Sequence, residues 1–66
     1  MSRALRVETA RKALADLTGV LEDASLIAVE GQTALDLIVA RQTCNRLIEV
    51  LEACLARLHR LRRQLR

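Results

Sequence analysis

The stretch Glu30-Gly31-Gln32-Thr33 decides the fold, because it separates two regular apolar patterns that are out of phase. Before it, apolar residues recur at alternating steps of three and four, which is typical of one face of a long helix. These residues are Val7, Ala10, Leu14, Leu17, Leu21, Ala24 and Ala28. A second run of the same kind comprises Leu37, Ala40, Cys44, Leu47, Leu51, Cys54, Leu58, Leu61 and Leu65. Since the first pattern extends to Leu35 and Ile38 instead, one helix must end and another begin between residues 29 and 36.

Residues in this stretch carry signals for the end and the start of a helix. Gly31 suits the left-handed conformation that ends many helices. Thr33 suits an N-cap, and Asp36 three residues later gives a variant of the capping box. Ser2 can cap the first helix. We therefore expect a helix over about 3–30, a turn at 31–33 and a helix over about 34–65, whereas breaks near Gly19 or Asn45 would give three helices.

The expected fold is a single all-α unit over residues 1–66, an antiparallel αα-hairpin that turns near Gly31. Folding the chain at residue 32 pairs Val7 with Leu58, Leu14 with Leu51, and Leu17 with Leu47, so that every layer is apolar. The predicted core and dimer residues are Leu14, Leu17, Leu21, Leu47, Leu51 and Leu58.

One seam between two helices is a small core for this chain. Ordering 66 residues costs on the order of 100 kcal/mol of conformational free energy. Further apolar residues flank the seam and widen the apolar stripe beyond the need of two helices. They are Ala13, Val20, Ile27, Ile48, Val50 and Leu55. We therefore expect a homodimer, in which two hairpins form a coiled-coil-like four-helix bundle.

Charge is unevenly distributed along the sequence, with a net charge of +3. Both ends of the chain are basic and the middle is acidic, so an antiparallel pair of hairpins would place unlike charges together. The basic ends are also a possible nucleic-acid surface, although the chain has no aromatic residue for base stacking. The cations of this possible surface are Arg57, Arg60, Arg62, Arg63 and Arg66 with Arg3 and Arg6.

Several large aliphatic residues near the turn fall outside the expected seams. A cluster of this kind on a small protein suggests a contact surface for another protein. The predicted partner-binding residues are Leu26, Val29, Leu35, Ile38 and Val39.

Residue patterns that support catalysis are absent from the sequence. It contains no Cys-x-x-Cys, His-x-x-x-His or Glu-x-x-His pattern, and its two glycines cannot build a phosphate loop. His59 is expected on the surface, and Cys44 and Cys54 are expected inside, where thiols are inert. We expect no enzymatic activity, no metal and no cofactor.

No apolar run is long enough for a membrane span, because Arg41 and Arg46 interrupt the most apolar region. The first residues turn acidic too soon for a secretion signal. A cytoplasmic location without membrane association is expected.

In length and period the chain resembles plasmid copy-number regulators of the Rop type, which are hairpins that dimerise into four-helix bundles. Two functions are consistent with the sequence. The first is a regulator, an inhibitor of bacterial, phage or plasmid origin, or a chaperone or adaptor, in each case a homodimer that binds another protein. The alternative is a Rop-like RNA- or DNA-binding regulator that uses the basic helix ends.

Overall fold

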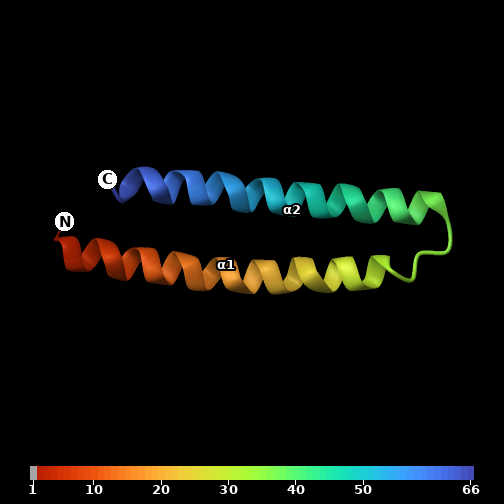
Figure 1. The fold of residues 1–66 in the computed structure, drawn as a ribbon, viewed down its shortest axis with the longest axis horizontal. Helices are drawn as coiled ribbons and strands as arrows, with labels where there is room; N and C mark the ends of the chain where they lie inside the picture. Colours follow the sequence, from red (N-terminus) through yellow and green to blue (C-terminus); the bar gives the residue numbers. More distant parts are fainter. Residues whose placement is uncertain (1) are drawn as a thin grey trace.

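Two long antiparallel helices form the protein, as the computed structural model shows for residues 2–66 (Figure 1). Helix α1 spans Arg3–Gly31, helix α2 spans Leu37–Gln64, and the two helices pack against each other along their length. The molecule measures 52 × 16 × 9 Å. The predicted helical hairpin is confirmed. Both helices run unbroken through the alternative positions, Gly19 and Asn45.

Side-chain caps define where the helices begin. The Ser2 hydroxyl accepts a hydrogen bond of 3.1 Å from the amide of Leu5, as expected of an N-cap. At the second helix the cap is Asp36, whose carboxylate accepts a 2.9 Å hydrogen bond from the amide of Val39. Helix α2 therefore starts at Leu37 and not at residue 34.

Thr33 has a different role from the one predicted. Its hydroxyl donates a 2.8 Å hydrogen bond to the carbonyl of Glu30, in the last turn of α1. It therefore satisfies a carbonyl at the end of the first helix, and the turn covers residues 32–36 in place of 31–33.

Gly31 is also used differently from the prediction. No residue in the described part of the chain has a positive φ, so Gly31 is a right-handed helical residue. A Cβ atom at this position would lie 2.6 Å from Cγ2 of Thr43 on α2. Gly31 therefore suits this position because the two helices approach closely here, and not because the chain turns in a left-handed conformation.

The longer turn changes the register of the two helices. Helix α2 extends past the end of α1 at the turn (Figure 1), and Gly31 lies against Thr43. Near the other end Leu17 lines a pocket together with Arg57 and Leu61, and not with Leu47 as predicted. The predicted pairing of layers is thus wrong, because it assumed a short turn centred on residue 32, whereas α1 ends at Gly31 and α2 begins only at Leu37.

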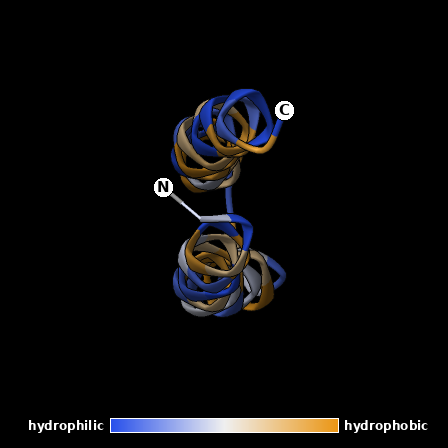
Figure 2. Ribbon diagram, turned by 90° about the vertical axis from the view of Figure 1, so that its left-hand side faces the viewer, coloured by the Kyte–Doolittle hydropathy of each residue, from blue (hydrophilic) through white to orange (hydrophobic). Residues whose placement is uncertain are grey.

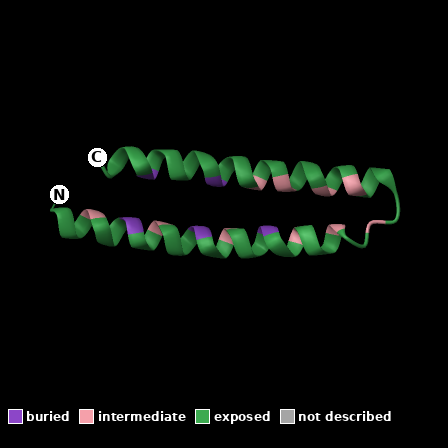
Figure 3. Cartoon of the chain, in the orientation of Figure 1, coloured by how far each residue is buried: buried purple, intermediate pink, exposed green. Residues whose placement is uncertain are grey.

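Buried and half-buried residues lie along the facing sides of the helices (Figure 3). We call this row the seam. On α1 it comprises Arg6, Ala10, Ala13, Leu17, Val20, Ala24, Ile27 and Gly31. On α2 it comprises Ala40, Thr43, Leu47, Val50, Cys54 and Leu61.

The seam consists mainly of small residues, which allow two helices to pack closely. Hydrophobic residues are nevertheless not confined to it: they also occur on the sides of both helices that face away from the neighbouring helix (Figure 2). Neither helix combines the length and hydropathy needed to cross a bilayer, within residues 2–66.

Candidate functional site

A row of mainly large aliphatic residues runs beside the seam and is only partly covered. Every member except Val7 follows a seam residue by four positions, and Val7 precedes Leu14 by seven, so all share one side of their helix. We call this row the leucine flank. It comprises Val7, Leu14, Leu21 and Ala28 on α1 with Cys44, Leu51, Leu58 and Leu65 on α2.

The two halves of the leucine flank lie on the same side of the hairpin. At the turn end, Ala28 of α1 and Cys44 of α2 line one shared hollow. The charged residues Glu30 and Arg46 line a different hollow between the same two helices. At the turn end, the side of the hairpin with the leucine flank is therefore mainly apolar, and the opposite side carries charge.

The leucines of the flank are highly exposed for side chains of their size. Leu14, Leu21 and Leu51 are each 48% exposed. Of the leucines predicted as core and dimer residues, Leu17 is buried and Leu47 is half-buried, and both lie in the seam. The other predicted leucines, Leu14, Leu21, Leu51 and Leu58, lie on the leucine flank and outside the seam, because smaller residues take the places between the helices.

The cysteines correct a second expectation. Cys54 is buried in the seam, as predicted, but Cys44 is exposed on the leucine flank. Both thiols are free. Cys44 follows Ala40 by four positions, and the rotation of α2 that places Thr43 in the seam turns Cys44 outward.

The hairpin exposes much more surface than a compact protein of its mass. A compact monomer of 7.4 kDa would have roughly 4,200 Å² of accessible surface, whereas this chain has 5567 Å². Its radius of gyration is 15.7 Å, against about 11 Å for a compact chain of this length. Five side chains are buried among the described residues, and none of them is fully inaccessible. The hairpin therefore lacks a second layer over its apolar side.

Most of the cations predicted to lie at the basic ends are brought to one end of the molecule, which we call the open end. The guanidinium of Arg6 donates a 2.9 Å hydrogen bond to the backbone carbonyl of Arg66, which joins the two chain ends. The guanidinium nitrogen Nη2 of Arg62 lies 3.2 Å from Nδ1 of the exposed His59. All Lys and Arg residues except Arg41 and Arg46 belong to the first 12 or the last ten residues of the chain.

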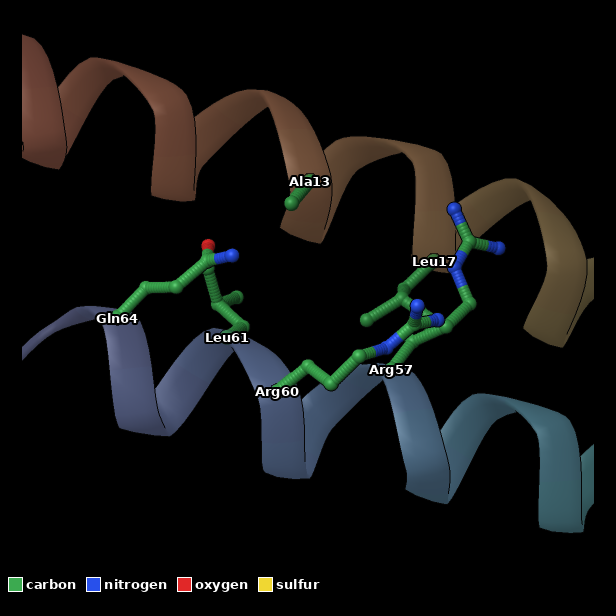
Figure 4. A pocket seen from close by; sticks show the side chains of 6 residues that line it. All are labelled: Ala13, Leu17, Arg57, Arg60, Leu61 and Gln64. Atoms are coloured by element: carbon green, nitrogen blue, oxygen red, sulfur yellow. The ribbon is translucent and has the colours of Figure 1, made fainter.

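A pocket between the helices lies near this end, and Figure 4 shows its lining. We call it the arginine pocket. Arg57 and Arg60 extend from α2 toward the end of the pocket where Leu17 of α1 lies, and Gln64 lies at the other end (Figure 4). Ala13, Leu17 and Leu61 form its apolar part, and its volume is about 190 Å³.

A second hollow of about 450 Å³ adjoins the arginine pocket, because Leu61 and Gln64 line both. Its remaining lining residues are Arg6, Thr9 and Leu65. The periodicity placed the arginines at the open end but did not predict either hollow. Arg57 is the residue from which the pocket could have been predicted. It follows Val50 by seven positions and so stands where the seam would continue.

The predicted partner-binding residues are all exposed at the turn end. Leu35 is 99% exposed in the turn, and Ile38 is 70% exposed in the first turn of α2. Leu26, Val29 and Val39 are also exposed. They share one end of the hairpin, but their spacing along the two helices places them on different sides of it.

The leucine flank and the open end are the two contact surfaces of this arrangement. Within residues 2–66, no three His, Cys, Asp or Glu side chains gather where they could hold a metal ion. The leucine flank can bury aliphatic surface against a partner. The arginine side chains at the open end can donate hydrogen bonds to anions.

No protein-family model, curated protein or solved structure matches this chain. The resemblance to hairpins of the Rop type therefore remains one of length and period.

Proposed function

We propose that the chain is a non-enzymatic helical hairpin that pairs with a second copy into a four-helix bundle. In this form it binds another protein as a regulator, inhibitor, chaperone or adaptor. The observation that carries the proposal is the leucine flank, whose aliphatic side chains run along one side of the hairpin and stay about half exposed. Contiguous apolar surface of this extent is unusual on a monomeric protein.

A second copy suits the leucine flank in area and in charge. The chain exposes roughly 1,400 Å² more than a compact monomer, and a standard interface buries about 800 Å² on each partner. The turn half of the hairpin contains the acidic residues Glu22, Asp23, Glu30 and Asp36, and the open end contains all Lys and Arg residues except Arg41 and Arg46. Two copies packed antiparallel would bring unlike charges together at both ends of the bundle.

The dimer is tested by measuring mass in solution with light scattering. We expect twice the chain mass for the protein, and a shift toward the monomer for Leu21→Ser, which removes a large aliphatic group from the leucine flank. Leu26→Ser is the matched control, because Leu26 is 61% exposed and lies outside the flank. A monomer in the unchanged protein at millimolar concentration would overturn the dimer.

Alkylation of Cys44 gives a second measure of the same interface. Cys44 lies on the leucine flank and Cys54 in the seam, so dimerisation should slow the labelling of Cys44, and dilution should restore it. Labelling of Cys54 should be slow at every concentration at which the hairpin is folded. A Cys44 rate that does not depend on concentration would contradict a dimer through this face.

Binding of another protein is proposed for the exposed aliphatic residues at the turn end. Changing Leu26, Leu35 and Val39 together to Ser should leave helicity and dimer mass unchanged and abolish capture of the partner. Loss of the dimer in this triple variant would mean instead that the turn end belongs to the dimer interface.

Nucleic-acid binding is the second candidate, and the observation that favours it is the meeting of both basic chain ends at Arg6 and Arg66. Phosphate contacts give affinity that falls steeply with salt, whereas aliphatic docking changes little. The nucleic-acid candidate prevails if nuclease releases the partner and if neutralising Arg57, Arg60 and Arg63 abolishes capture while the aliphatic changes do not.

A further inference from the structure

Arg57 stands at a position of α2 where the pattern of the seam predicts an uncharged residue, because every seam residue of α2 is uncharged. Thr43 and Val50 precede it at intervals of seven, and both are half-buried between the helices. Ala13 and Leu17 line the arginine pocket from α1, and the side chain of Arg57 crosses toward α1 beside Leu17 (Figure 4). The open half of the seam therefore ends in a cationic hollow and not in aliphatic packing.

Donors surround this hollow and acidic side chains do not. Arg57, Arg60 and Gln64 line the arginine pocket, and Arg6 and Thr9 line the hollow beside it. No carboxylate is among the described residues that line either one. Guanidinium groups match carboxylates and phosphates through paired hydrogen bonds, so the ligand that suits this lining is an oxyanion.

We propose that the arginine pocket and the adjoining hollow bind a short acidic segment of a partner protein. Carboxylates of the segment contact Arg57 and Arg60, and an aliphatic side chain beside them covers Leu61. This inference rests on the proposed protein-binding function and names the chemistry of the partner.

Size and polarity favour a peptide over other anions. The arginine pocket by itself, at about 190 Å³, is smaller than the usual pocket for a small molecule, which begins at about 300 Å³, and the adjoining hollow continues the site past Leu61 and Gln64. The arginine pocket has room for single side chains. Its apolar part, formed by Ala13, Leu17 and Leu61, suits the methylene groups of glutamate and a neighbouring leucine, and a bare phosphate would gain nothing from it. The absence of aromatic residues also removes the usual platform for nucleic-acid bases.

The pocket remains accessible in the proposed dimer. None of the residues that line the arginine pocket belongs to the leucine flank. Only Leu65, in the adjoining hollow, belongs to both surfaces. A dimer through the flank would therefore leave Arg57 and Arg60 free for a third chain.

The test is a titration of the ¹⁵N-labelled full chain with the peptide acetyl-Glu-Leu-Glu-Glu-Leu-Glu-amide, followed by the amide shifts. We expect the largest shifts at Ala13, Leu17 and Leu61. Affinity should fall by roughly tenfold or more in the double variant R57Q/R60Q, because charge-assisted hydrogen bonds are lost. The matched control is R62Q/R63Q, which removes the same charge from the same helix outside the pocket and should bind within about twofold of the unchanged protein.

Three further probes decide the chemistry. The peptide with Gln in place of every Glu should not bind, and inorganic phosphate and a single-stranded thymidine oligonucleotide should bind more weakly than the acidic peptide at the same amides. Circular dichroism checks that each variant is folded, and the single variant R60Q replaces R57Q/R60Q if the double variant is not.

Several results would overturn the proposal. An equal loss of affinity in both double variants would reduce the effect to net charge, and tighter binding of the oligonucleotide would assign the site to nucleic acid. Absence of shifts at the pocket would remove the site altogether. Failure of the proposed function shows separately, in the dimer mass and in capture by the turn-end residues, none of which lines the pocket.

Discussion

The seam and the leucine flank are neighbouring rows on the same two helices, and they differ in the size of their residues. The seam is built largely from Ala, Gly, Thr and Val, and it holds all five of the buried residues in the described part of the chain. The flank carries larger residues, of which Leu14 and Leu21 are each 48% exposed. Close approach of the two helices is thus obtained with small side chains, and the larger aliphatic groups are left for a further layer.

Leu17→Ala should have the largest effect on stability. Leu17, at 5% exposed, is the large buried residue of α1. We expect a loss of about 2 to 5 kcal/mol in the free energy of unfolding, enough to remove most of the helical signal in thermal melts followed by circular dichroism. Leu21→Ala on the flank should cost less in the monomer. An equal cost for both changes at high dilution would break the distinction between seam and flank.

Gly31→Ala tests how closely the helices approach at the turn end of the seam. A Cβ atom there would lie 2.6 Å from Cγ2 of Thr43, and overpacking of this kind costs about 1 to 3 kcal/mol. Thr43→Ser removes the obstructing methyl group and should recover part of the loss in chemical denaturation. If Gly31→Ala raises stability, the helices are farther apart than described.

Asp36→Ala tests the residue that positions α2, and with it the choice of seam. Removing a carboxylate that accepts from the Val39 amide should cost about 1 kcal/mol. Thr33→Ala is the control, since the hydroxyl of Thr33 bonds the Glu30 carbonyl and does not cap α2. A larger loss of melting temperature for Thr33→Ala would place the start of α2 earlier.

Gly19→Ala should have the smallest effect, and in the opposite direction. Nothing lies within 4 Å of a Cβ atom at Gly19, which belongs to neither the seam nor the flank. Alanine there should stabilise the hairpin by about 0.5 to 1 kcal/mol through helix propensity alone. Destabilisation in the same denaturation experiment would reveal a contact at this position, such as one made by a second chain.

The sequence predicted the hairpin and the first cap, because a phase break between two long heptad runs has few other solutions. It did not predict which row would form the seam. Ala10 and Leu17 belong to the predicted and the observed seams alike, but the residues three and four positions after Ala10 are both apolar, Ala13 and Leu14. Periodicity cannot choose between two such neighbours, since the choice depends on how closely the helices approach.

The candidate site was only partly predictable for a related reason. The spacing of charges placed the arginines at the open end, and the Arg6–Arg66 hydrogen bond agrees with this. The arginine pocket depends on the register, which changed when Asp36 and not Thr33 capped α2. The length of the turn therefore decides whether Arg57 shares a pocket with Leu17.

Contacts between the two helices join residues at increasing sequence separation from the turn to the open end. Gly31 and Thr43 meet across a short loop, whereas Arg6 and Arg66 are separated by 60 positions. Because loop closure costs more entropy as the loop lengthens, we expect the two helices to pair first at the turn and to separate first at the open end. Amide hydrogens near both chain ends should then exchange first. A ligand that bridges α1 and α2 at the arginine pocket would clamp the end that opens most readily.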